Sequence, residues 1–429
     1  MNVHFITFGC KANQYDTETF RQELEARGAT VVDDPSEADA CVVNTCTVTM
    51  KADAAARKAI RRIKRENPEV QMLVAGCSAS FVPQMFEKME AVDEIVGGHD
   101  AVEVADRLAP ESPLLERHEE PIGGVLLEED QRGTRAWMKI QDGCDRRCAF
   151  CATRLARGAS RSRQPSEIVE EARKLAEHHH EIVFTGIHIG HYGRDLEDGH
   201  TLGSLVERLT DEVEGVRFRL GSIEATEIDD QLLDLLAERG DRLVPHLHIP
   251  MQAGSDKVLR RMRRWHTREQ YRSRVKEICE RLPYLGLGAD VIVGFPGEGE
   301  EEYEQTRALV EELPFNYLHV FPYSERQGTP AVDLDEKVQS RVAARRSKEL
   351  REMAVQKGKA YRRSRVGQRA TVIVESAHRG LSEDYLRVGL EGYGDEDRGR
   401  RLEVVLELDE QGELMGGAID GDVDRGAAQ

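Results

Sequence analysis

The stretch GCDRRCAFC, from Gly143 to Cys151, contains three cysteines, Cys144, Cys148 and Cys151. Thiolates are soft ligands that suit zinc, copper(I) or iron–sulfur clusters. A structural zinc site needs a fourth Cys or His, and the nearest downstream histidines, His178–His180, lie at the end of an expected helix. Three thiolates can instead hold three irons of a four-iron cluster and leave the fourth iron open to a ligand. A partial zinc site or a chance spacing is the alternative.

The chain around this stretch alternates between expected strands and helices, from Thr134 to about Pro330. Six βα units predict a complete or partial α/β barrel, whose chemistry takes place at the carboxyl ends of the strands. The cysteine loop follows the first of these strands directly and therefore lies at that end. The expected strands are AWMKIQ (136–141), EIVFTG (181–186), RFRLGS (217–222), HLHIPM (246–251), ADVIVGF (289–295) and YLHVFPY (317–323), with helices that include Pro165–His178, Leu202–Glu212 and Glu300–Glu312.

A second alternation, from Asn2 to about Ala101, predicts a parallel sheet with helices on its faces, a Rossmann-like α/β domain. Cys10, Cys46 and Cys77 each follow one of its expected strands. Such strand ends form one crevice in a doubly wound sheet, so we expect the three thiols to converge. Buried apolar cysteines are the alternative, and Cys41 and Cys279 are interpreted in that way. The expected elements are the strands VHFITF (3–8), ACVVN (40–44) and QMLVAG (71–76) and the helices Asp16–Arg27 and Lys51–Glu66.

The segments that flank the barrel differ from it in composition. Asp106–Gly133 is rich in Glu, Pro and Gly, which predicts a linker with one strand, GVLLE (124–128). A long basic helix is expected at about Glu336–Arg363. Beyond Val366, the segments ATVIVES, DYLRVGL and RLEVVLEL alternate between apolar and polar residues, as in a small antiparallel β-barrel. The expected domains are residues 1–110, 130–363 and 364–429.

Length and composition limit the classes of protein that this chain can be. Its 429 residues suffice for two or three domains, and no apolar stretch approaches the ~18 residues of a membrane helix. The N-terminus lacks the pattern of a secretory signal, and the eight cysteines lack framework spacing. We therefore expect a cytoplasmic protein with no membrane partner.

The formal net charge of −19 disfavours binding to nucleic acid, because phosphate groups require Lys and Arg. Two runs, Lys257–Lys276 and Glu336–Arg365, are nevertheless basic, and the first carries nine Lys or Arg residues against one Glu. They are either solvated helix faces or patches that contact phosphates. Composition leaves both interpretations open.

With six βα units behind it, the cysteine loop resembles the radical S-adenosylmethionine (SAM) superfamily. The resemblance implies that Cys144, Cys148 and Cys151 hold a [4Fe–4S] cluster whose open iron binds SAM, which is then cleaved to a deoxyadenosyl radical. It also implies that Phe150 packs against the adenine. Four segments place Gly or polar residues just after barrel strands: TGIHIG, RLGSIEA, HIPMQAGSD and DVIVGFPGE. Candidate SAM contacts there are Gly186, Ser222, Glu224 and Gln252, for which turn or cap roles are the alternative.

Over essentially its whole length, the chain resembles the methylthiotransferases, in TFGCKANQYDTE (7–18), NTCTVT (44–49), AGCSA (75–79) and ARGASRSR (156–163). The resemblance implies a second [4Fe–4S] cluster held by Cys10, Cys46 and Cys77, a central radical SAM barrel and a C-terminal TRAM barrel that binds RNA. Two features depart from the family pattern. Ala152–Leu155 replaces an Ile-Ile-Pro-aromatic run, and the tail is more acidic than an RNA-binding module.

The implied reaction adds a methylthio group at an unactivated C–H bond, which requires a radical, and no side chain is assigned as catalytic. One SAM methylates a sulfur at the second cluster and another SAM yields the radical. Lys11, Asn13 and Gln14 are most similar to the group acting on N6-threonylcarbamoyladenosine at position 37 of tRNA, next to the anticodon. Prenylated-adenosine enzymes tend to have Gln-Met-Asn there and ribosomal-protein enzymes Pro-Lys-Asn. The implied partners are a tRNA anticodon stem-loop, a reducing electron donor and a sulfur source.

Other functions stay open from the sequence. Within the family, the substrate could be a prenylated tRNA adenosine or an aspartate of a ribosomal protein. From other classes, the chain could be a non-catalytic iron–sulfur protein that binds RNA or senses redox state, or a zinc-binding structural protein.

Overall fold

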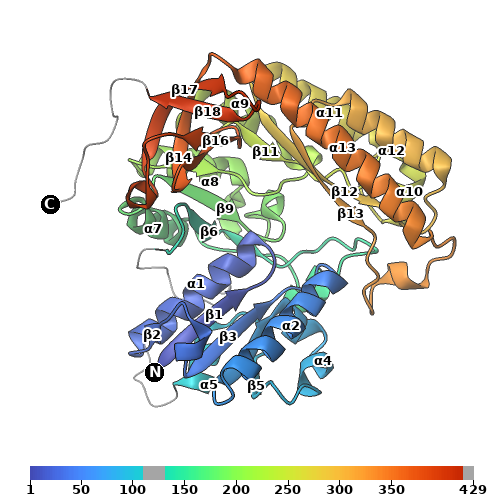
Figure 1. The fold of residues 1–429 in the computed structure, drawn as a ribbon. Helices are drawn as coiled ribbons and strands as arrows, with labels where there is room; N and C mark the ends of the chain where they lie inside the picture. The colour runs from blue at the N-terminus through green and yellow to red at the C-terminus, as the bar shows by residue number, and fades with distance from the viewer. Residues whose placement is uncertain (110–130, 419–429) are drawn as a thin grey trace.

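The N-terminal sheet is built on two apolar runs, 40–45 and 71–76, that are buried along almost their whole length. The computed structural model (Figure 1) describes residues 1–109 and 131–418. The strand expected at 124–128, most of the expected linker and the domain boundaries expected at 110 and 130 lie outside these residues. The strands are parallel and lie in the order β2-β1-β3-β4-β5, which confirms the predicted α/β domain.

The three strands and two helices expected in this domain are present, but its first helix begins earlier, and the helix Ala101–Leu108 extends into the linker expected from Asp106. The first helix begins at Lys11 rather than Asp16, because its first two turns bury the polar residues Asn13 and Asp16, which interrupt the apolar pattern. The strands are β1 (Asn2–Thr7), β2 (Thr30–Val31), β3 (Ala40–Thr45), β4 (Gln71–Gly76) and β5 (Glu94–Ile95). The helices are α1 (Lys11–Ala26), η1 (Pro35–Glu37), α2 (Met50–Glu66), α3 (Cys77–Phe81), α4 (Gln84–Glu87) and α5 (Ala101–Leu108).

All six expected barrel strands are present, and they form a partial barrel. Two parallel three-stranded sheets, β10-β9-β6 and β11-β12-β13, are joined by the parallel bridges Phe218–Leu243 and Ser222–His248. The strands are β6 (Ala136–Lys139), β9 (Glu181–Thr185), β10 (Arg217–Arg219), β11 (His246–His248), β12 (Gly286–Val293) and β13 (Tyr317–Pro322), with a short pair β7 (Gln141–Asp142) and β8 (Arg161–Ser162).

Helices cover the outer face of this barrel, and its core includes Phe184 stacked on Phe218, with 5.2 Å between the ring centres. The helices are α6 (Thr153–Arg157), α7 (Pro165–Ala176), η2 (Ile189–His191), η3 (Glu197–Gly199), α8 (Leu202–Glu212), η4 (Ala225–Glu227), α9 (Asp230–Glu238), α10 (Asp256–Arg261), α11 (Arg268–Arg281), α12 (Glu300–Glu312), η5 (Pro330–Asp333) and α13 (Ser340–Arg365).

The C-terminal segment closes into a barrel in the order β14-β15-β16-β18-β17. Four of its strand pairs are antiparallel, as expected, but β16 and β18 are parallel. A closed ring of five strands cannot reverse direction at every step, so one parallel pair is unavoidable. The elements are β14 (Arg369–Ser376), β15 (Arg379–Ser382), β16 (Arg387–Leu390), η6 (Asp395–Asp397), β17 (Arg401–Leu408) and β18 (Leu414–Ala418).

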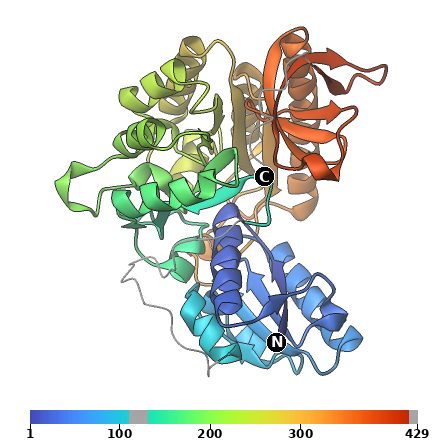
Figure 2. The ribbon, with the colours of Figure 1, turned by 90° about the vertical axis from the view of Figure 1, so that its left-hand side faces the viewer.

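The three domains dock closely. Figures 1 and 2 show the N-terminal domain as a lower lobe whose helix α1 faces the barrel, with the C-terminal barrel beside the upper lobe. Tyr15 on α1 donates a hydrogen bond to Glu171 on α7. From β10, Arg219 Nη1 donates to the Glu383 carbonyl at 2.9 Å and Arg217 Nη1 to the Thr371 carbonyl at 2.9 Å. Within the residues described, none of the helices is long and apolar enough to cross a membrane.

Candidate active site

The loop Gly143–Cys151 is held by backbone contacts with residues 158–159 and with Met262 at the end of α10. Gly143 has φ +69°, and a Cβ at this position would lie 1.8 Å from the Ala159 carbonyl oxygen. Cys144 N donates to the Gly158 carbonyl at 3.1 Å, and Ala149 N donates to the Met262 carbonyl at 2.9 Å. The loop therefore places its three cysteines, which we call the loop trio, in a fixed backbone frame.

Polar side chains of the barrel approach two thiols of the loop trio. His188 Nδ1 lies 3.5 Å from Cys144 Sγ, and Arg264 Nη1 donates to Cys148 Sγ at 3.5 Å. Burial raises the pKa of Cys144 to about 12 and also raises that of Cys148, although Arg264 opposes the second shift. These thiols are therefore protonated near neutral pH unless a metal group replaces their protons.

Cys10, Cys46 and Cys77, which we call the sheet trio, meet at the carboxyl edge of the N-terminal sheet. They follow β1, β3 and β4, which lie side by side. Cys10 Sγ and Cys77 Sγ lie 3.9 and 3.7 Å from the same atom, Asn13 Oδ1. Gly9, with φ +114°, leaves room for Cys46, whose Sγ would lie 2.8 Å from a Cβ at that position. The expected convergence of these three thiols is therefore observed.

Hydrogen bonds fix the orientation of Asn13. Its Nδ2 donates to the carbonyls of Phe8 and Thr45, each at 2.8 Å. Its Oδ1 is thereby turned toward the thiols. Burial is the main cause that raises the pKa of Cys46 to about 11 and that of Cys77 to about 12, and the neighbouring Cys10 thiol contributes to both shifts.

Arg157, from the barrel domain, reaches into the sheet trio. Its Nε donates to Cys77 Sγ at 3.3 Å and its Nη2 to Asn13 Oδ1 at 2.7 Å. The same guanidinium pairs with Asp142 at 2.8 Å and with Asp16 at 2.7 Å. Burial alone would raise the pKa of Asp142, but Arg157 holds it far below its ordinary value. A buried guanidinium beside three thiols favours their ionised form. It therefore fits a metal group, whose binding requires thiolates.

The spacing of the thiols distinguishes a cluster from a zinc ion. A tetrahedral zinc ion with Zn–S distances of about 2.3 Å brings its sulfurs to about 3.8 Å from one another. Among the residues described, the triads with all ligand atoms within 4.8 Å of one another are His188–His191–Glu227 and His248–Asp290–His319, and neither cysteine trio is among them. Each trio is therefore spread more widely than one zinc ion requires, as thiolates on separate irons of one cluster would be.

A cavity of about 520 Å³ lies between the three domains. The sheet trio borders it through Cys10 and Cys46, and the barrel borders it through Gly186 and Ser222. Its volume falls within the range of about 300–1,000 Å³ that holds small-molecule ligands. Its remaining walls carry aromatic and histidine rings from the barrel and the C-terminal domain, namely His246, His248, Tyr317, His319, Phe321 and Tyr385.

The rings of this cavity are connected by hydrogen bonds. The Tyr317 hydroxyl lies 2.8 Å from His246 Nε2 and 3.1 Å from His248 Nδ1. Asp290 lies 3.1 Å from His248 Nε2 and 3.2 Å from His319 Nδ1. Burial alone would raise the pKa of Asp290, but the two histidines hold it below its ordinary value. These walls are therefore fixed before any ligand enters.

The remaining candidate SAM contacts lie apart from this cavity. Phe150 is half-buried and packs edge-on against Phe295, with 6.3 Å between ring centres. Glu224 is buried and pairs with Arg264, so it lies beside the loop trio. Gln252 has φ +62° and bridges to Val291, which is a backbone role. Among the described residues that line the cavity, the predicted barrel residues are Gly186 and Ser222.

Sequence reasoning missed the residues that link the domains. Asn13, Asp16 and Arg157 lie in segments that resemble the methylthiotransferases, but the sequence does not indicate their contacts with the thiols and with one another. The signal was their residue type, since an Asn and an Asp that interrupt an apolar helix pattern indicate buried polar contacts. Lys139 and Asp142, which complete this network, carried no recognisable pattern.

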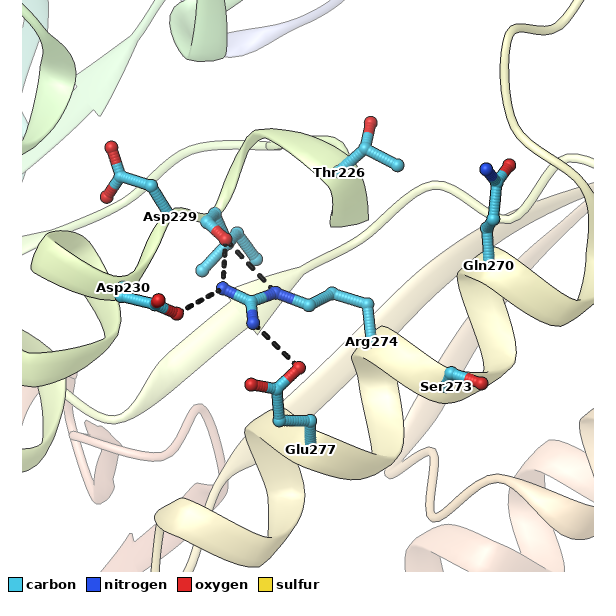
Figure 3. Close-up of a pocket in the computed structure, with 8 residues that line it drawn as sticks. Thr226, Asp229, Asp230, Gln270, Ser273, Arg274 and Glu277 are labelled. Atoms are coloured by element: carbon cyan, nitrogen blue, oxygen red, sulfur yellow. Dashed lines mark hydrogen bonds and ion pairs between the residues drawn. The ribbon is translucent and has the colours of Figure 1, made fainter.

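The first basic run, Lys257–Lys276, is largely neutralised by acidic side chains. Figure 3 shows a surface pocket of about 510 Å³ beside α11, in which Arg274 pairs with Asp230 at 3.4 Å and with Glu277 at 2.7 Å. These contacts favour ion-paired helix faces over a phosphate-binding patch for this run. Six of its nine cations form ion pairs, namely Lys257, Arg261, Arg264, Arg272, Arg274 and Lys276.

Two families match this sequence. Residues 2–97 match the family described as uncharacterized protein family UPF0004, and residues 138–310 match the radical SAM superfamily. These segments correspond to the domains that carry the sheet trio and the loop trio.

Curated relatives align over most of the chain. Threonylcarbamoyladenosine tRNA methylthiotransferase MtaB of Bacillus subtilis (strain 168) is 39% identical, over 90% of this chain and 88% of that protein. MtaB of Aquifex aeolicus (strain VF5) is 35% identical, over 95% of this chain and 100% of that protein. The tRNA-2-methylthio-N(6)-dimethylallyladenosine synthase of Staphylococcus aureus (strain Newman) is 31% identical, over 96% and 84%.

Solved structures with a similar fold include two enzymes that combine SAM with cobalamin. The radical SAM methyltransferase TsrM from Kitasatospora setae gives a TM-score of 0.54 at 15% identity, over 75% of this chain and 72% of that chain. The cobalamin-dependent SAM radical enzyme OxsB gives 0.50 at 14% identity, over 82% and 56%. At such identities the likeness concerns the fold alone.

Proposed function

Since this chain belongs to the radical SAM tRNA methylthiotransferase family, we propose that it converts N6-threonylcarbamoyladenosine at position 37 of tRNA to its 2-methylthio derivative. The MtaB relatives, at 35–39% identity, are named for this nucleoside. The Lys-x-Asn-Gln sequence at residues 11–14 supports the same substrate. The reaction needs an electron donor and a source of sulfur, and we place it in the cytoplasm with its tRNA.

One observation carries this proposal: two separate cysteine trios lie in neighbouring domains, and the sheet trio borders the cavity between the domains. We assign Cys144, Cys148 and Cys151 to a [4Fe–4S] cluster that binds SAM, and the sheet trio to a second [4Fe–4S] cluster. With SAM bound, the two clusters would supply the electron, the radical and a site for the sulfur, none of which a side chain provides. The donor chemistry fits, because each trio offers three thiols at a spacing wider than one zinc ion requires.

The contribution of this chain is to orient the reactants and exclude water. Asn13 and Arg157 hold the sheet trio in place from two domains. The rings of Tyr317, Phe321 and Tyr385 offer surfaces on which an unstacked anticodon-loop base can pack. Phe150, Gly186, Ser222, Glu224 and Gln252 remain our candidates for SAM contacts.

The proposal is tested by nucleoside analysis of tRNA from cells that lack the gene. We expect 2-methylthio-N6-threonylcarbamoyladenosine to disappear and its unmethylthiolated precursor to accumulate. The wild-type gene should restore the product, whereas genes encoding Cys46→Ala or Cys148→Ala should not. Prenylated adenosines in the same digest serve as the internal control.

Two results would contradict this assignment. Loss of a methylthiolated prenyl adenosine, with the threonylcarbamoyl product intact, would move the substrate to the group represented by the Staphylococcus aureus relative. An unchanged nucleoside profile would remove tRNA as the substrate, and a mass shift on a ribosomal-protein aspartate would then be sought.

A further inference from the structure

Lys11 is a cation at the wall of the central cavity. It opens helix α1 directly after Cys10, and its side chain is half-buried. Among the described residues that line the cavity, it is the one lysine or arginine. The acidic residue of the lining, Asp290, is already bound to His248 and His319. Among the described residues that line the cavity, Lys11 therefore has no acidic side chain left to pair with.

The neighbourhood of Lys11 supplies no counter-charge. Glu181, the carboxylate whose charge acts on Lys11, is shared by Arg135, Arg217 and Arg219. Within the described part of the chain, no ion pair or hydrogen bond of Lys11 Nζ is formed. Burial and the charges of Arg135 and Arg219 lower the pKa of Lys11 to about 7, because an ammonium group without a partner is unfavourable away from water, and a bound anion would remove that cost.

Aromatic rings position the ammonium group. Lys11 Nζ lies 5.2 Å from the centre of the Trp137 ring and 5.9 Å from the centre of the Tyr385 ring. Tyr385 stacks on His246, with 4.3 Å between ring centres. Contact with ring faces attracts a cation without neutralising it, so the ammonium group keeps its capacity for an anion.

We propose that Lys11 is a specificity-determining residue that binds the carboxylate of the substrate's threonylcarbamoyl group. This inference rests on the proposed function. The threonylcarbamoyl substituent on N6 ends in a free carboxylate, whereas a prenyl substituent carries no charge. The cavity offers ring faces for the adenine and one ammonium group for the acid. A neutral substituent would leave that ammonium group unpaired, and the cavity would bind it less well.

The test compares two anticodon stem-loops that differ in one charge. One carries N6-threonylcarbamoyladenosine, and the other carries its methyl ester. Binding of each to the cluster-loaded protein is measured by fluorescence anisotropy without SAM. Because a hydrogen bond to a charged group contributes about 1.5–3 kcal/mol, the wild type should bind the acid roughly 10- to 150-fold more tightly than the ester. Lys11→Met should bind the acid as weakly as the ester and bind the ester like wild type.

Lys51→Met is the matched control. Lys51 is exposed on α2, between the cavity residues Thr49 and Ala52, and does not line the cavity. If Lys51→Met weakens the electrostatic attraction to RNA, it should weaken binding of the acid stem-loop and of the ester stem-loop by the same factor. Lys11→Arg, which keeps the charge, should retain part of the preference. Iron content and SAM cleavage, measured for each variant, show that the clusters are intact.

Two failures are distinguishable. If wild-type protein converts the acid stem-loop but Lys11→Met keeps the full preference for acid over ester, Lys11 does not bind the carboxylate and the proposed function stands. If wild-type protein forms no methylthio product from the acid stem-loop, under conditions in which it cleaves SAM, the proposed function itself is wrong.

Discussion

The two cysteine trios use the same kinds of side chain but are assembled in opposite ways. The loop trio lies within one stretch of backbone, whereas the sheet trio comes from the ends of three strands. In both, an arginine donates to one thiol and a histidine nitrogen lies 3.5 Å from a thiol. The contacts are Arg264–Cys148 and His188–Cys144 in the loop trio, and Arg157–Cys77 and His99–Cys77 in the sheet trio.

The difference lies in where each arginine comes from. Arg264 belongs to the same domain as the loop trio, so that site is complete within the barrel. Arg157 belongs to the barrel but contacts Cys77, so the sheet trio is complete only when two domains are docked. Damage to docking should therefore impair the sheet trio and spare the loop trio.

The largest expected effect separates the two trios by their chemistry. Cys148→Ala and Cys77→Ala should each lose about half of the bound iron and sulfide. Cys148→Ala should form no 5′-deoxyadenosine on reduction with SAM, whereas Cys77→Ala should form it but yield no methylthio product. Iron analysis and chromatography measure both quantities. Full iron content in Cys77→Ala would show that the sheet trio holds no cluster.

Removal of each arginine tests the dependence on docking. Arg157→Met leaves Asp16 and Asp142 buried with Lys139 and with His99, whose pKa burial lowers to about 3, and this should lower the free energy of unfolding by about 3–5 kcal/mol. Arg264→Met is the control. Burial raises the pKa of Glu224, so this carboxyl can become neutral once its partner is gone, and the loss should be smaller. Urea unfolding measures the free energy of unfolding of both variants. An equal decrease in the two would contradict the idea that only the sheet trio depends on domain docking.

Glycine substitutions test how far the loop trio depends on its local backbone. Gly143→Ala places a Cβ 1.8 Å from the Ala159 carbonyl oxygen at φ +69°, so the loop must shift. Gly158→Ala meets open space, but its φ +79° and ψ −155° lie in a region that glycine alone adopts readily, so it should cost about 1–3 kcal/mol of backbone strain. Gly143→Ala should cost about 1–3 kcal/mol more and should impair SAM cleavage while the sheet trio keeps its iron. Equal free energies of unfolding and equal SAM cleavage in both variants would show that the backbone contacts at Gly143 do not position the loop trio.

The smallest expected effect is the pH dependence of the docked network. Arg157 and Lys139 overcome burial and hold the pKa of Asp142 below the unfolded value of about 3.9. Its stabilising contribution is therefore complete above that pH and is lost as the pH falls through the folded pKa. Below about pH 4 the free energy of unfolding should therefore fall by about 1.4 kcal/mol per pH unit, because the unfolded chain binds a proton at this carboxyl that the folded chain does not. Unfolding of the metal-free chain between pH 5 and 3 should show a smaller slope in Asp142→Asn, and an unchanged slope would contradict the network.

Most secondary structure was predictable, because apolar periodicity reports burial directly. The six barrel strands and the three main strands of the N-terminal sheet lie where the pattern placed them. The start of α1 was misplaced, since Asn13 and Asp16 are polar yet buried. The small strands β15 and β18 and the parallel pairing of β18 were missed, because strands of four or five residues are too short to show a pattern.

By itself, the sequence determined which cysteines meet. The loop trio follows from spacing along one loop, and the sheet trio follows from the rule that parallel strands end at one edge. Only the tertiary structure decided what surrounds them: Arg157 reaches Cys77 across 80 residues, and Lys11 faces a cavity that three domains enclose. The physical reason is that a buried charge finds its partner, or remains without one, only once the domains have packed together.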